Sequence, residues 1–321
     1  MTQAQEAMLP PRTVLEECVR AATLAPSIYN TQPWRFRLRP GAVEVFADTV
    51  RILPAVDPDG REMHISLGAA VLNIEVMLQA HGYCPNVTLL PDPARPDLVA
   101  RVEAEGQMSP TLVDLVRVAA LTRRRTTREP FTDRPLHESL VDSLTDAARL
   151  EGATFRVLDG SDSQALLALV RTADQGLRRD PAYRNEVARW TTDYPNRQDG
   201  VLPDSFGPLS ADAALPVRDF GAYQPWLDRE PEQYETNPTI AVLATAGDGE
   251  EDWLRAGMAL QRVLLDATIA GVSASFLTQP LEVPHLRRLY DERWPHVATQ
   301  MVFRLGYARQ PGAATTPPRP V

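Results

Sequence analysis

Polar, aromatic and cationic side chains gather in two short segments of the sequence. The first, Ala25–Trp34, reads Ala-Pro-Ser-Ile-Tyr-Asn-Thr-Gln-Pro-Trp and follows an apolar stretch typical of a helix. The second, Arg123–Phe131, places four guanidiniums around two hydroxyl groups in a chain whose net charge is -9. The chain has no lysine, so its side-chain cations at neutral pH are arginines. Any phosphate that it binds must therefore be held by guanidinium forks, backbone N–H groups and hydroxyls.

The second stretch, called the arginine segment below, is suited to a terminal phosphate monoester. Guanidiniums donate paired hydrogen bonds to phosphate oxygens, and Thr126 and Thr127 add hydroxyl donors. In an acidic chain such a cluster indicates a local anion site rather than a basic surface. A solvated loop that makes surface salt bridges explains the same spacing equally well. The segment alone does not decide between the two interpretations.

The first stretch, called the helix-exit segment below, also has two interpretations. Asn30 and Gln32 carry amides that can read both the donor and the acceptor edge of a heteroaromatic ring. Pro26 and Ser27 end the preceding helix and expose backbone N–H groups. Taken alone, the segment is better explained as an ordinary helix exit in which Trp34 is a core residue.

Composition and charge exclude several classes of function. A chain of 321 residues that is 44% hydrophobic can bury a large core, in one domain or in two lobes. Its acidic balance argues against nucleic acid or an anionic membrane as the main partner. Cys18 and Cys84 form no disulfide framework, and the scattered histidines predict no metal site. Since Met1–Arg12 lacks the apolar core of a secretion signal, and no uninterrupted apolar run is long enough to span a bilayer, we expect a cytoplasmic protein.

The sequence contains an internal repeat. Two helical stretches are each followed by a Phe-Arg segment that predicts a strand ending at a glycine; they are Val14–Ala22, before Phe36, and Leu140–Ala148, before Phe155. Two long apolar helices then end at Gly82 and Gly271, and each is followed by a strand, at Asn86–Leu90 and Ala298–Leu305. These helices, at 63–82 and 252–271, are apolar on too many sides to lie on the surface, so we expect them to be buried against each other.

The repeat predicts the fold class and the domain organisation. We expect an α+β fold of two fused repeats, residues 1–108 and 109–321, which form an intramolecular pseudo-dimer with mixed sheets surrounded by helices. The second repeat is longer, and composition places an insertion at about 178–237 that is rich in Pro, Asp and aromatic residues. Such insertions are commonly functional lids. A packing arm that embraces the other lobe or a second chain is nearly as good an explanation.

Taken together, the two segments resemble the nitroreductase family, whose members bind FMN at a dimer interface. The family's helix-exit motif, Ala-Pro-Ser-x-x-Asn-x-Gln-Pro-Trp, is matched throughout by Ala25–Trp34. The family's motif Arg-Arg-Ser-x-Arg-x-Phe is similar to Arg124–Phe131, with one extra residue and Thr in place of Ser. Ordinary members carry both motifs in one repeat, whereas here each repeat carries one. This split resembles the fused-repeat, Acg-like branch, and Asp57–Glu62 with Ile65–Ala70 and the Trp190…Asp199-Gly200 pattern support it.

The resemblance implies a set of flavin-binding residues. Arg124, Arg125, Thr126 and Arg128 are expected to hold the FMN phosphate and ribityl chain. Pro26 and Ser27 are expected to contact the ring from the other lobe, with Asn30 and Gln32 nearby. The remaining expected contacts are backbone groups facing flavin N5 and a C-terminal basic residue at the phosphate, namely Ser273, Ala274, Ser275 and Arg319. Many family members use a lysine near flavin N1 and O2, and the sequence assigns no substitute for it.

The resemblance leaves two principal functions open. One is an FMN-dependent oxidoreductase in which NAD(P)H, bound transiently, reduces the flavin, which then reduces a nitroaromatic, a quinone or a similar small-molecule acceptor. The flavin carries this chemistry, so no catalytic side chain is required. The other is a non-enzymatic protein that sequesters or stores FMN beneath a lid. A third interpretation, a degenerate module without cofactor, makes the complementary motifs a coincidence. The resemblance implies a monomeric pseudo-dimer or a homodimer.

Overall fold

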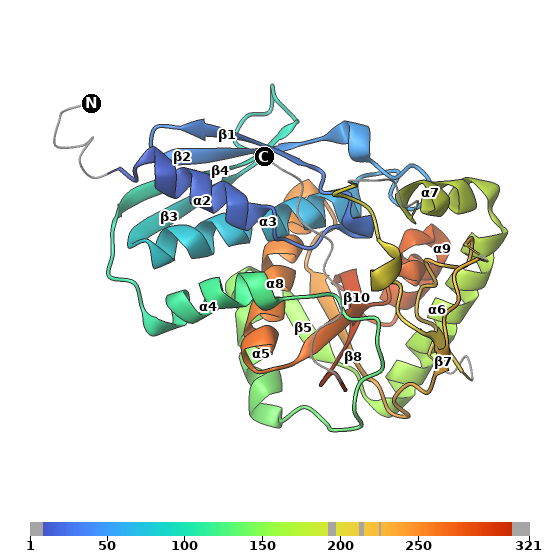
Figure 1. Ribbon diagram of the computed structural model, residues 1–321. Coiled ribbons are helices and arrows are strands. Elements are labelled where there is room, and N and C mark those ends of the chain that lie inside the picture. The colour runs from blue at the N-terminus through green and yellow to red at the C-terminus, as the bar shows by residue number, and fades with distance from the viewer. Residues whose placement is uncertain (1–8, 192–196, 212–214, 225, 310–321) are drawn as a thin grey trace.

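Two four-stranded sheets with the same strand order organise the chain (Figure 1). The computed structural model describes residues 9–191, 197–211, 215–224 and 226–309. The first sheet has the order β1-β2-β4-β3, from strands Trp34–Arg39, Ala42–Ala47, Leu98–Gln107 and Tyr83–Leu89. The second has the order β5-β8-β10-β9, from strands Thr154–Val157, Thr239–Thr245, Ala298–Gly306 and Ser273–Phe276. The fold is therefore α+β, as the sequence predicts.

The pairing within these sheets differs from the expected mixture of directions. Each pairing of neighbouring strands in both four-stranded sheets is antiparallel. In the described part of the chain, parallel pairing is limited to the two-residue strands β6 (Leu209–Ser210) and β7 (Pro231–Glu232) and to an isolated bridge between Thr126 and Ala274. That bridge brings the arginine segment alongside β9.

Helices occupy matching positions around the two sheets. Helix α2 (Arg12–Ala22) precedes the first sheet and α5 (Glu138–Leu150) precedes the second. Helices α3 (Arg61–Ala80) and α8 (Glu250–Ile269) each follow the second strand of their sheet. Helix α4 (Leu112–Arg123) connects the two halves and begins at a capping box in which Thr111 and Asp114 satisfy each other's backbone N–H groups.

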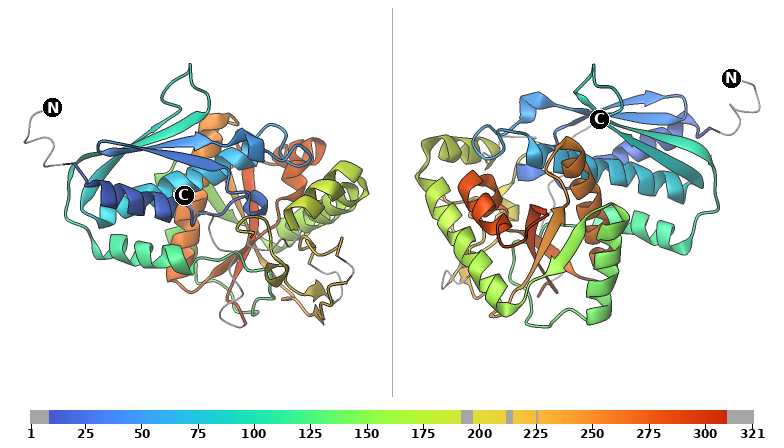
Figure 2. Two further views of the ribbon diagram at one scale, coloured as in Figure 1. Left: turned by 45° about the horizontal axis from the view of Figure 1, so that its top comes forward. Right: turned by 180° about the vertical axis from the view of Figure 1, so that it is seen from behind.

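Helices α3 and α8 cross at two glycines between the sheets (Figure 2). A Cβ atom on Gly68 would lie 2.0 Å from the carbonyl oxygen of Leu254, and one on Gly257 would lie 2.0 Å from that of Ile65. The sequence predicts these helices to be buried against each other, and the structure confirms it. The two glycines lie within the helices, at the crossing, because only residues without a Cβ allow the backbones to approach so closely.

By length and composition, α3 could cross a membrane, but 78% of its most apolar window is buried inside the protein. Its neighbours are α8 and α2, together with strands of the first sheet. Burial on nearly all sides explains the continuous apolar sequence of this core helix.

The strand that follows α8 is not the one that the sequence indicates. The prediction treats Asn86–Leu90 and Ala298–Leu305 as equivalent strands of the two repeats. The strand that follows α8 is instead β9, and Ala298–Gly306 is β10, the last strand of the second sheet in chain order. Strand β9 is only four residues long, and η4 (Gln279–Glu282) and α9 (Pro284–Asp291) separate it from β10. So short a segment gives little periodicity to detect.

A long connection, residues 158–238, joins β5 to β8, whereas β1 and β2 are joined by a tight turn. It begins earlier than the insertion predicted at about 178, since α6 (Gly160–Arg179) belongs to it. Composition does not reveal this start, because α6 has the composition of an ordinary amphipathic helix. Helix α7 (Pro181–Thr191) and the 3₁₀ turn Pro203–Ser205 follow. The first half supplies two other such turns, Ile28–Asn30 and Thr49–Arg51.

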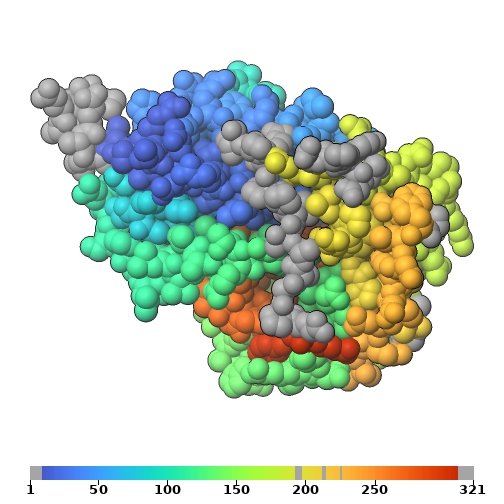
Figure 3. All heavy atoms as spheres, in the orientation of Figure 1, coloured from blue at the N-terminus to red at the C-terminus, as the bar shows by residue number. Residues whose placement is uncertain are grey.

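Aromatic residues of the long connection pack on the first half of the chain. Tyr183, Trp190, Phe206 and Phe220 form one buried cluster with Tyr29 and with residues of the loop before α3. The Glu186 carboxylate accepts a hydrogen bond from the backbone N–H of Ala55, at 3.0 Å. Figure 3 shows the yellow and yellow-green surface of the connection on the side of the molecule next to the blue surface of the first half. Burial of these rings attaches the described parts of a segment rich in proline and aspartate to the first half.

Candidate functional site

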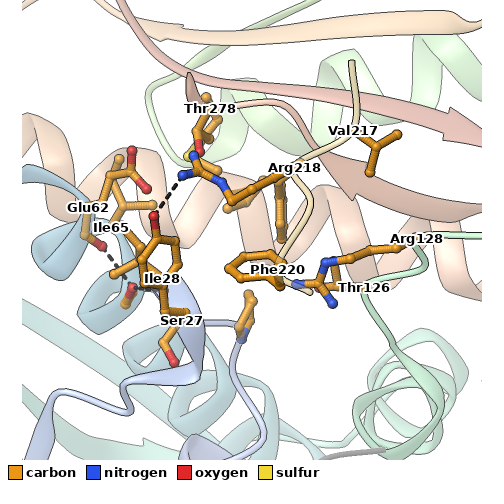
Figure 4. A pocket seen from close by; sticks show the side chains of 16 residues that line it. Ser27, Ile28, Glu62, Ile65, Thr126, Arg128, Val217, Arg218, Phe220 and Thr278 are labelled. Atoms are coloured by element: carbon orange, nitrogen blue, oxygen red, sulfur yellow. Dashed lines mark hydrogen bonds between the residues drawn. The ribbon is translucent and has the colours of Figure 1, made fainter. Parts of the chain in front are cut away.

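A pocket lies where the two sequence segments meet (Figure 4). It holds about 730 Å³ of empty space, part of it open to solvent. Five parts of the chain line it: the helix-exit segment, the start of α3, the arginine segment, the long connection, and the second half from α8 to β10. The lining residues are Pro26, Ser27, Ile28, Tyr29, Glu62, Ile65, Ser66, Thr126, Arg128, Val217, Arg218, Phe220, Leu260, Phe276, Thr278 and Met301.

The helix-exit segment reaches the pocket through a tight, strained turn. After Ser27, which is extended, Tyr29, Asn30 and Gln32 have φ values of 47°, 53° and 48°. Left-handed backbone is costly for residues with a Cβ and clusters at binding sites and active sites. The hydroxyl of Ser27 accepts a hydrogen bond from the backbone N–H of Gln32, at 3.0 Å, and so closes the turn. Pro26 and Ser27 are thereby presented to the pocket.

The two amides of this segment bind the long connection. The side-chain amide of Asn30 donates to the carbonyl oxygen of Gly200 at 3.0 Å, and that of Gln32 donates to the carbonyl oxygen of Gln198 at 2.6 Å. Between these two residues, the carboxylate of Asp199 accepts a hydrogen bond from Arg51 at 2.7 Å. Asn30 and Gln32 are not among the lining residues. In this structure their side chains fix the Gln198–Gly200 part of the connection to the helix-exit segment.

The arginine segment lies between α4 and the second sheet. The backbone N–H of Thr127 donates to the carbonyl oxygen of Ala274 at 2.9 Å, so the segment extends the sheet beside β9. Arg124 donates from Nη2 to the carbonyl oxygen of Leu24 at 3.3 Å, which links the segment to the end of α2. The helix-exit segment and the arginine segment are therefore brought together at one pocket.

The guanidiniums of this segment have no carboxylate partner among the residues that the structure describes. In the described ranges, Arg124, Arg125 and Arg128 form no ion pair, although Arg128 donates to the carbonyl oxygen of Ser205 at 2.7 Å. Burial, with the adjacent Arg125, lowers the pKa of Arg124 to about 10, and burial lowers that of Arg128 to about 10 as well. The Nε of Arg124 is buried without a hydrogen-bond partner. Buried cations without counter-ions are costly, and a bound anion removes that cost.

The long connection covers one side of the pocket with Val217, Arg218 and Phe220. The charge of Arg218 is balanced by the buried carboxylate of Glu282, with which it forms an ion pair. Arg218 also donates hydrogen bonds to the hydroxyls of Tyr29, at 2.7 Å, and Tyr183, at 3.1 Å. The pKa of Tyr29 rises well above its ordinary value because the ring is buried. These contacts join the connection to both halves of the chain at the pocket.

The acidic residue in the described lining is Glu62, in the first turn of α3. It is 5% exposed and accepts a hydrogen bond from Arg61 at 2.9 Å. In the view of Figure 4, Glu62 and Arg128 lie on opposite sides of the pocket. The side chains of Ile65, Leu260 and Met301 supply an apolar wall. The pocket thus has the guanidinium of Arg128 on one side and Glu62 on the other, with apolar side chains also in its lining.

Comparison with known proteins gives the family. No family model matches the chain. Two proteins of Mycobacterium tuberculosis H37Rv are similar along nearly their whole length. "Putative NAD(P)H nitroreductase acg" is 30% identical over 313 residues, which cover 96% of this chain and 94% of that protein, and "Putative NAD(P)H nitroreductase Rv3131" is 32% identical over 305 residues, which cover 92% and 85%. The chain belongs to the nitroreductase family.

A third relative in the same organism is "Uncharacterized protein Rv3127", 32% identical over 323 residues. Among solved structures, the chain is similar to "a putative nitroreductase" from Anabaena variabilis, with 12% identity, a TM-score of 0.49 and coverage of 95% of this chain and 91% of that one. A nitroreductase with bound FMN from Desulfitobacterium hafniense matches with 15% identity and a TM-score of 0.39, over 64% of this chain and 94% of that one.

The residues that the nitroreductase resemblance predicts differ in how they lie relative to the pocket. Pro26, Ser27, Thr126 and Arg128 line the pocket, and Arg124 joins the two segments beside it. Arg125 is exposed and donates to the carbonyl oxygen of Arg124 at 2.7 Å. Strand β9 carries Ser273, Ala274 and Ser275 directly before the lining residue Phe276 in the sequence. The Ser275 hydroxyl is buried and has no hydrogen-bond partner among the described residues. Arg319 lies outside the described residues.

Sequence analysis misses the side chains that close the pocket. Arg218 and Phe220 lie in the insertion, where only a general excess of aromatic residues marks them. Glu62 is the last residue of Asp57–Glu62. That stretch supports the family resemblance, but the sequence assigns it no role in the site. In the part of the chain that the structure describes, no group of three His, Cys, Asp or Glu side chains is placed to hold a metal ion.

Proposed function

We propose that the pocket binds FMN and that the protein is an NAD(P)H-dependent oxidoreductase of the nitroreductase type. The acceptor is a nitroaromatic, a quinone or a similar small molecule. The observation that carries the proposal is that the complementary motifs, one from each repeat, line one pocket. The relatives named as NAD(P)H nitroreductases support the donor, and a structural neighbour named with bound FMN agrees with the cofactor.

The residues present fit a flavin mononucleotide. Arg124, Arg125 and Arg128 offer guanidiniums for the phosphate that pair with no carboxylate of the described residues, and Thr126 offers a hydroxyl. An apolar wall of Leu260 and Met301 suits a flat ring. Pro26 and Ser27 approach the same space from the first repeat. Ser273, Ala274 and Ser275 belong to β9, whose last residue, Phe276, lines the pocket, and we propose that their backbone faces the ring. Asn30 and Gln32 contribute indirectly, because they hold the connection that covers the site.

When bound, FMN supplies the electron-transfer chemistry. The protein binds the phosphate, positions the ring between the repeats and limits the access of water and substrates. Arg218 and Phe220 perform this last task from the long connection, which acts as the lid. Arg319 in the C-terminal tail remains a candidate for a further phosphate contact.

The same proposal assigns one FMN to each chain. Residues 1–108 and 109–321 are fused repeats that form an intramolecular pseudo-dimer, and the equal strand order of their sheets supports this. Each repeat has lost one of the two motifs, so one of the two possible sites is complete. The protein then needs no second chain for its site and is a monomer or a homodimer, and we place it in the cytoplasm.

A second function, FMN sequestration or storage without turnover, is favoured by the cover over the pocket. The Arg218 contacts to Tyr29, Tyr183 and Glu282 tie the lid to buried groups, so its opening breaks several hydrogen bonds at once. A lid that rarely opens would keep nicotinamide and acceptor away from the ring.

The visible spectrum of the purified protein, before and after anaerobic NADPH, separates these functions. A flavin spectrum with about one FMN per chain, bleached by NADPH within seconds, supports the oxidoreductase. A flavin spectrum that NADPH leaves unchanged, while dithionite bleaches it, supports storage. A colourless protein that takes up no added FMN, or two FMN per chain, would refute the site.

A further inference from the structure

Glu62 is a buried carboxyl group in the wall of the pocket that the proposed flavin contacts leave unused. It stands in the first turn of α3, whose N–H groups at Glu62 and Met63 donate to the Asp57 carboxylate at 2.9 and 2.8 Å. This cap fixes the start of the helix and therefore the position of the Glu62 side chain. Glu62 lines the pocket on the side away from Arg128.

The surroundings of Glu62 disfavour its charged form. Its nearest cation, Arg61, also donates to the carbonyl oxygen of Gln300 at 2.6 Å, so it is shared. The carboxylates of Glu282 and Asp57 repel a charge on Glu62, and Arg218, which attracts it, is already paired with Glu282. Burial, followed by the charge of Glu282, raises the pKa of Glu62 to about 8. Near neutral pH the group is mostly a neutral acid and can donate a hydrogen bond.

The polarity of the pocket gives this donor a partner. Because Glu62 and Arg128 lie on opposite sides of the pocket, a ligand that has an anionic group at Arg128 and extends a flat ring across the pocket would bring its far edge toward Glu62. Heteroaromatic rings carry acceptor atoms at their edges, and a carboxylate there would repel them. An un-ionised carboxyl group satisfies them instead.

We propose that Glu62 is a proton-exchanging residue of the pocket, which binds ring ligands as a neutral acid and donates a hydrogen bond to an acceptor atom at the ring edge. The inference rests on the proposed FMN site and deepens it. Its consequence is linkage: above the pKa of the free group, FMN binding draws a proton from solvent onto Glu62. The affinity for FMN then falls by up to roughly tenfold for each pH unit.

A purely structural role is the competing explanation, in which Glu62 is an ion-paired partner of Arg61 in every state. An ion-paired carboxylate takes up no proton when FMN binds. Proton uptake on binding therefore distinguishes the two roles, whereas loss of activity does not.

The chain offers a matched control. Glu251 lies in the first turn of α8, six residues before the crossing glycine Gly257, as Glu62 lies six residues before Gly68. The Glu251 side chain is 56% exposed and pairs with Arg255 on the same helix. Glu251→Gln therefore removes a carboxylate at the equivalent helix position without touching the pocket.

The test is calorimetric titration of FMN into flavin-free full-length protein at pH 7.0 and pH 8.5, in buffers of different ionisation enthalpy. We expect wild type and Glu251→Gln to take up a substantial fraction of one proton at pH 8.5. Glu62→Gln should lack this fraction of the proton uptake. Its affinity for FMN should also fall less between pH 7.0 and pH 8.5 than that of wild type. Equal proton uptake in all three proteins would overturn the inference and leave the FMN site standing. Absence of FMN binding to wild type would overturn both.

An infrared measurement covers the case in which Glu62→Gln does not fold. The wild-type protein at pH 8.5 should gain the carbonyl band of a protonated carboxyl group when FMN binds. If FMN binds and no such band grows, Glu62 is not the proton-exchanging residue.

Discussion

The guanidinium of Arg128 lies 4.7 Å from the centre of the Phe220 ring. Arg128 belongs to the arginine segment and Phe220 to the long connection, so the proposed anion ligand and the cover of the pocket are in direct contact. An arginine over an aromatic face is favourable by about 0.5–2 kcal/mol, depending on how far it is desolvated. Binding of an anion at Arg128 and closure of the cover should therefore influence each other.

We predict that Arg128→Gln weakens FMN binding by roughly tenfold to a hundredfold, because charge-assisted hydrogen bonds contribute about 1.5–3 kcal/mol. Quenching of FMN fluorescence during titration of flavin-free protein gives the dissociation constant. Arg123→Gln is the matched control, since Arg123 belongs to the same run of arginines but is exposed at the end of α4 and does not line the pocket. Equal dissociation constants for the two variants would show that Arg128 does not bind the FMN phosphate.

Phe220→Ala tests whether the long connection acts as a lid. Loss of a buried aromatic ring over the pocket should increase the rate of flavin reduction by NADPH severalfold, as measured by anaerobic stopped-flow absorbance. Trp226→Ala serves as the comparison, because Trp226 lies in the same connection but is 77% exposed. An unchanged rate in a folded, flavin-loaded Phe220→Ala protein would favour the packing-arm interpretation.

The glycine pair at the helix crossing gives a stability prediction. Gly257→Ala places a Cβ against the carbonyl oxygen of Ile65, which is backbone and cannot move alone, so we expect a loss of about 1–3 kcal/mol or more in the free energy of unfolding. Gly176→Ala, within α6 and with no atom near its Cβ position, should instead gain roughly 0.5–1 kcal/mol. Urea unfolding measures both. Similar effects for the two substitutions would show that the crossing tolerates a wider spacing.

Periodicity and composition predict the framework of this fold because its core helices have strong local signals. Helix α3 is apolar on nearly every side and α8 has the same length and ending, so the sequence alone predicts two buried helices packed together. The role of Gly68 and Gly257 is not predictable in this way, since a glycine in a helix is explained only by what lies opposite. The short strand β9 is missed for the related reason that its identity depends on pairing with β10.

The residues of the candidate site likewise differ in whether the sequence alone can predict them. Pro26, Ser27, Thr126 and Arg128 belong to contiguous motifs, which a sequence displays directly, and they line the pocket. The functions of Asn30 and Gln32 depend on Gln198 and Gly200, more than 160 residues away in the chain. Glu62 and Phe220 likewise acquire their significance from tertiary contacts, which no local pattern encodes.

The pH dependence of stability tests the protonation of Glu62 without any ligand. A folded-state pKa of about 8, raised by burial and by Glu282, means that the folded protein holds this proton more tightly than the unfolded chain does. Stability from this group is therefore fully present below the unfolded pKa of a glutamate, near 4.3, and is lost as the pH rises toward 8. Glu62→Gln removes that term, so the free energy of unfolding of wild type minus that of the variant should decrease steadily from pH 5.5 to pH 8. Urea unfolding at four pH values, with Glu251→Gln as the exposed control, measures the difference. A difference that stays constant over this range, or increases with pH, would mean that Glu62 is ionised in the folded protein and that Arg61 outweighs its burial.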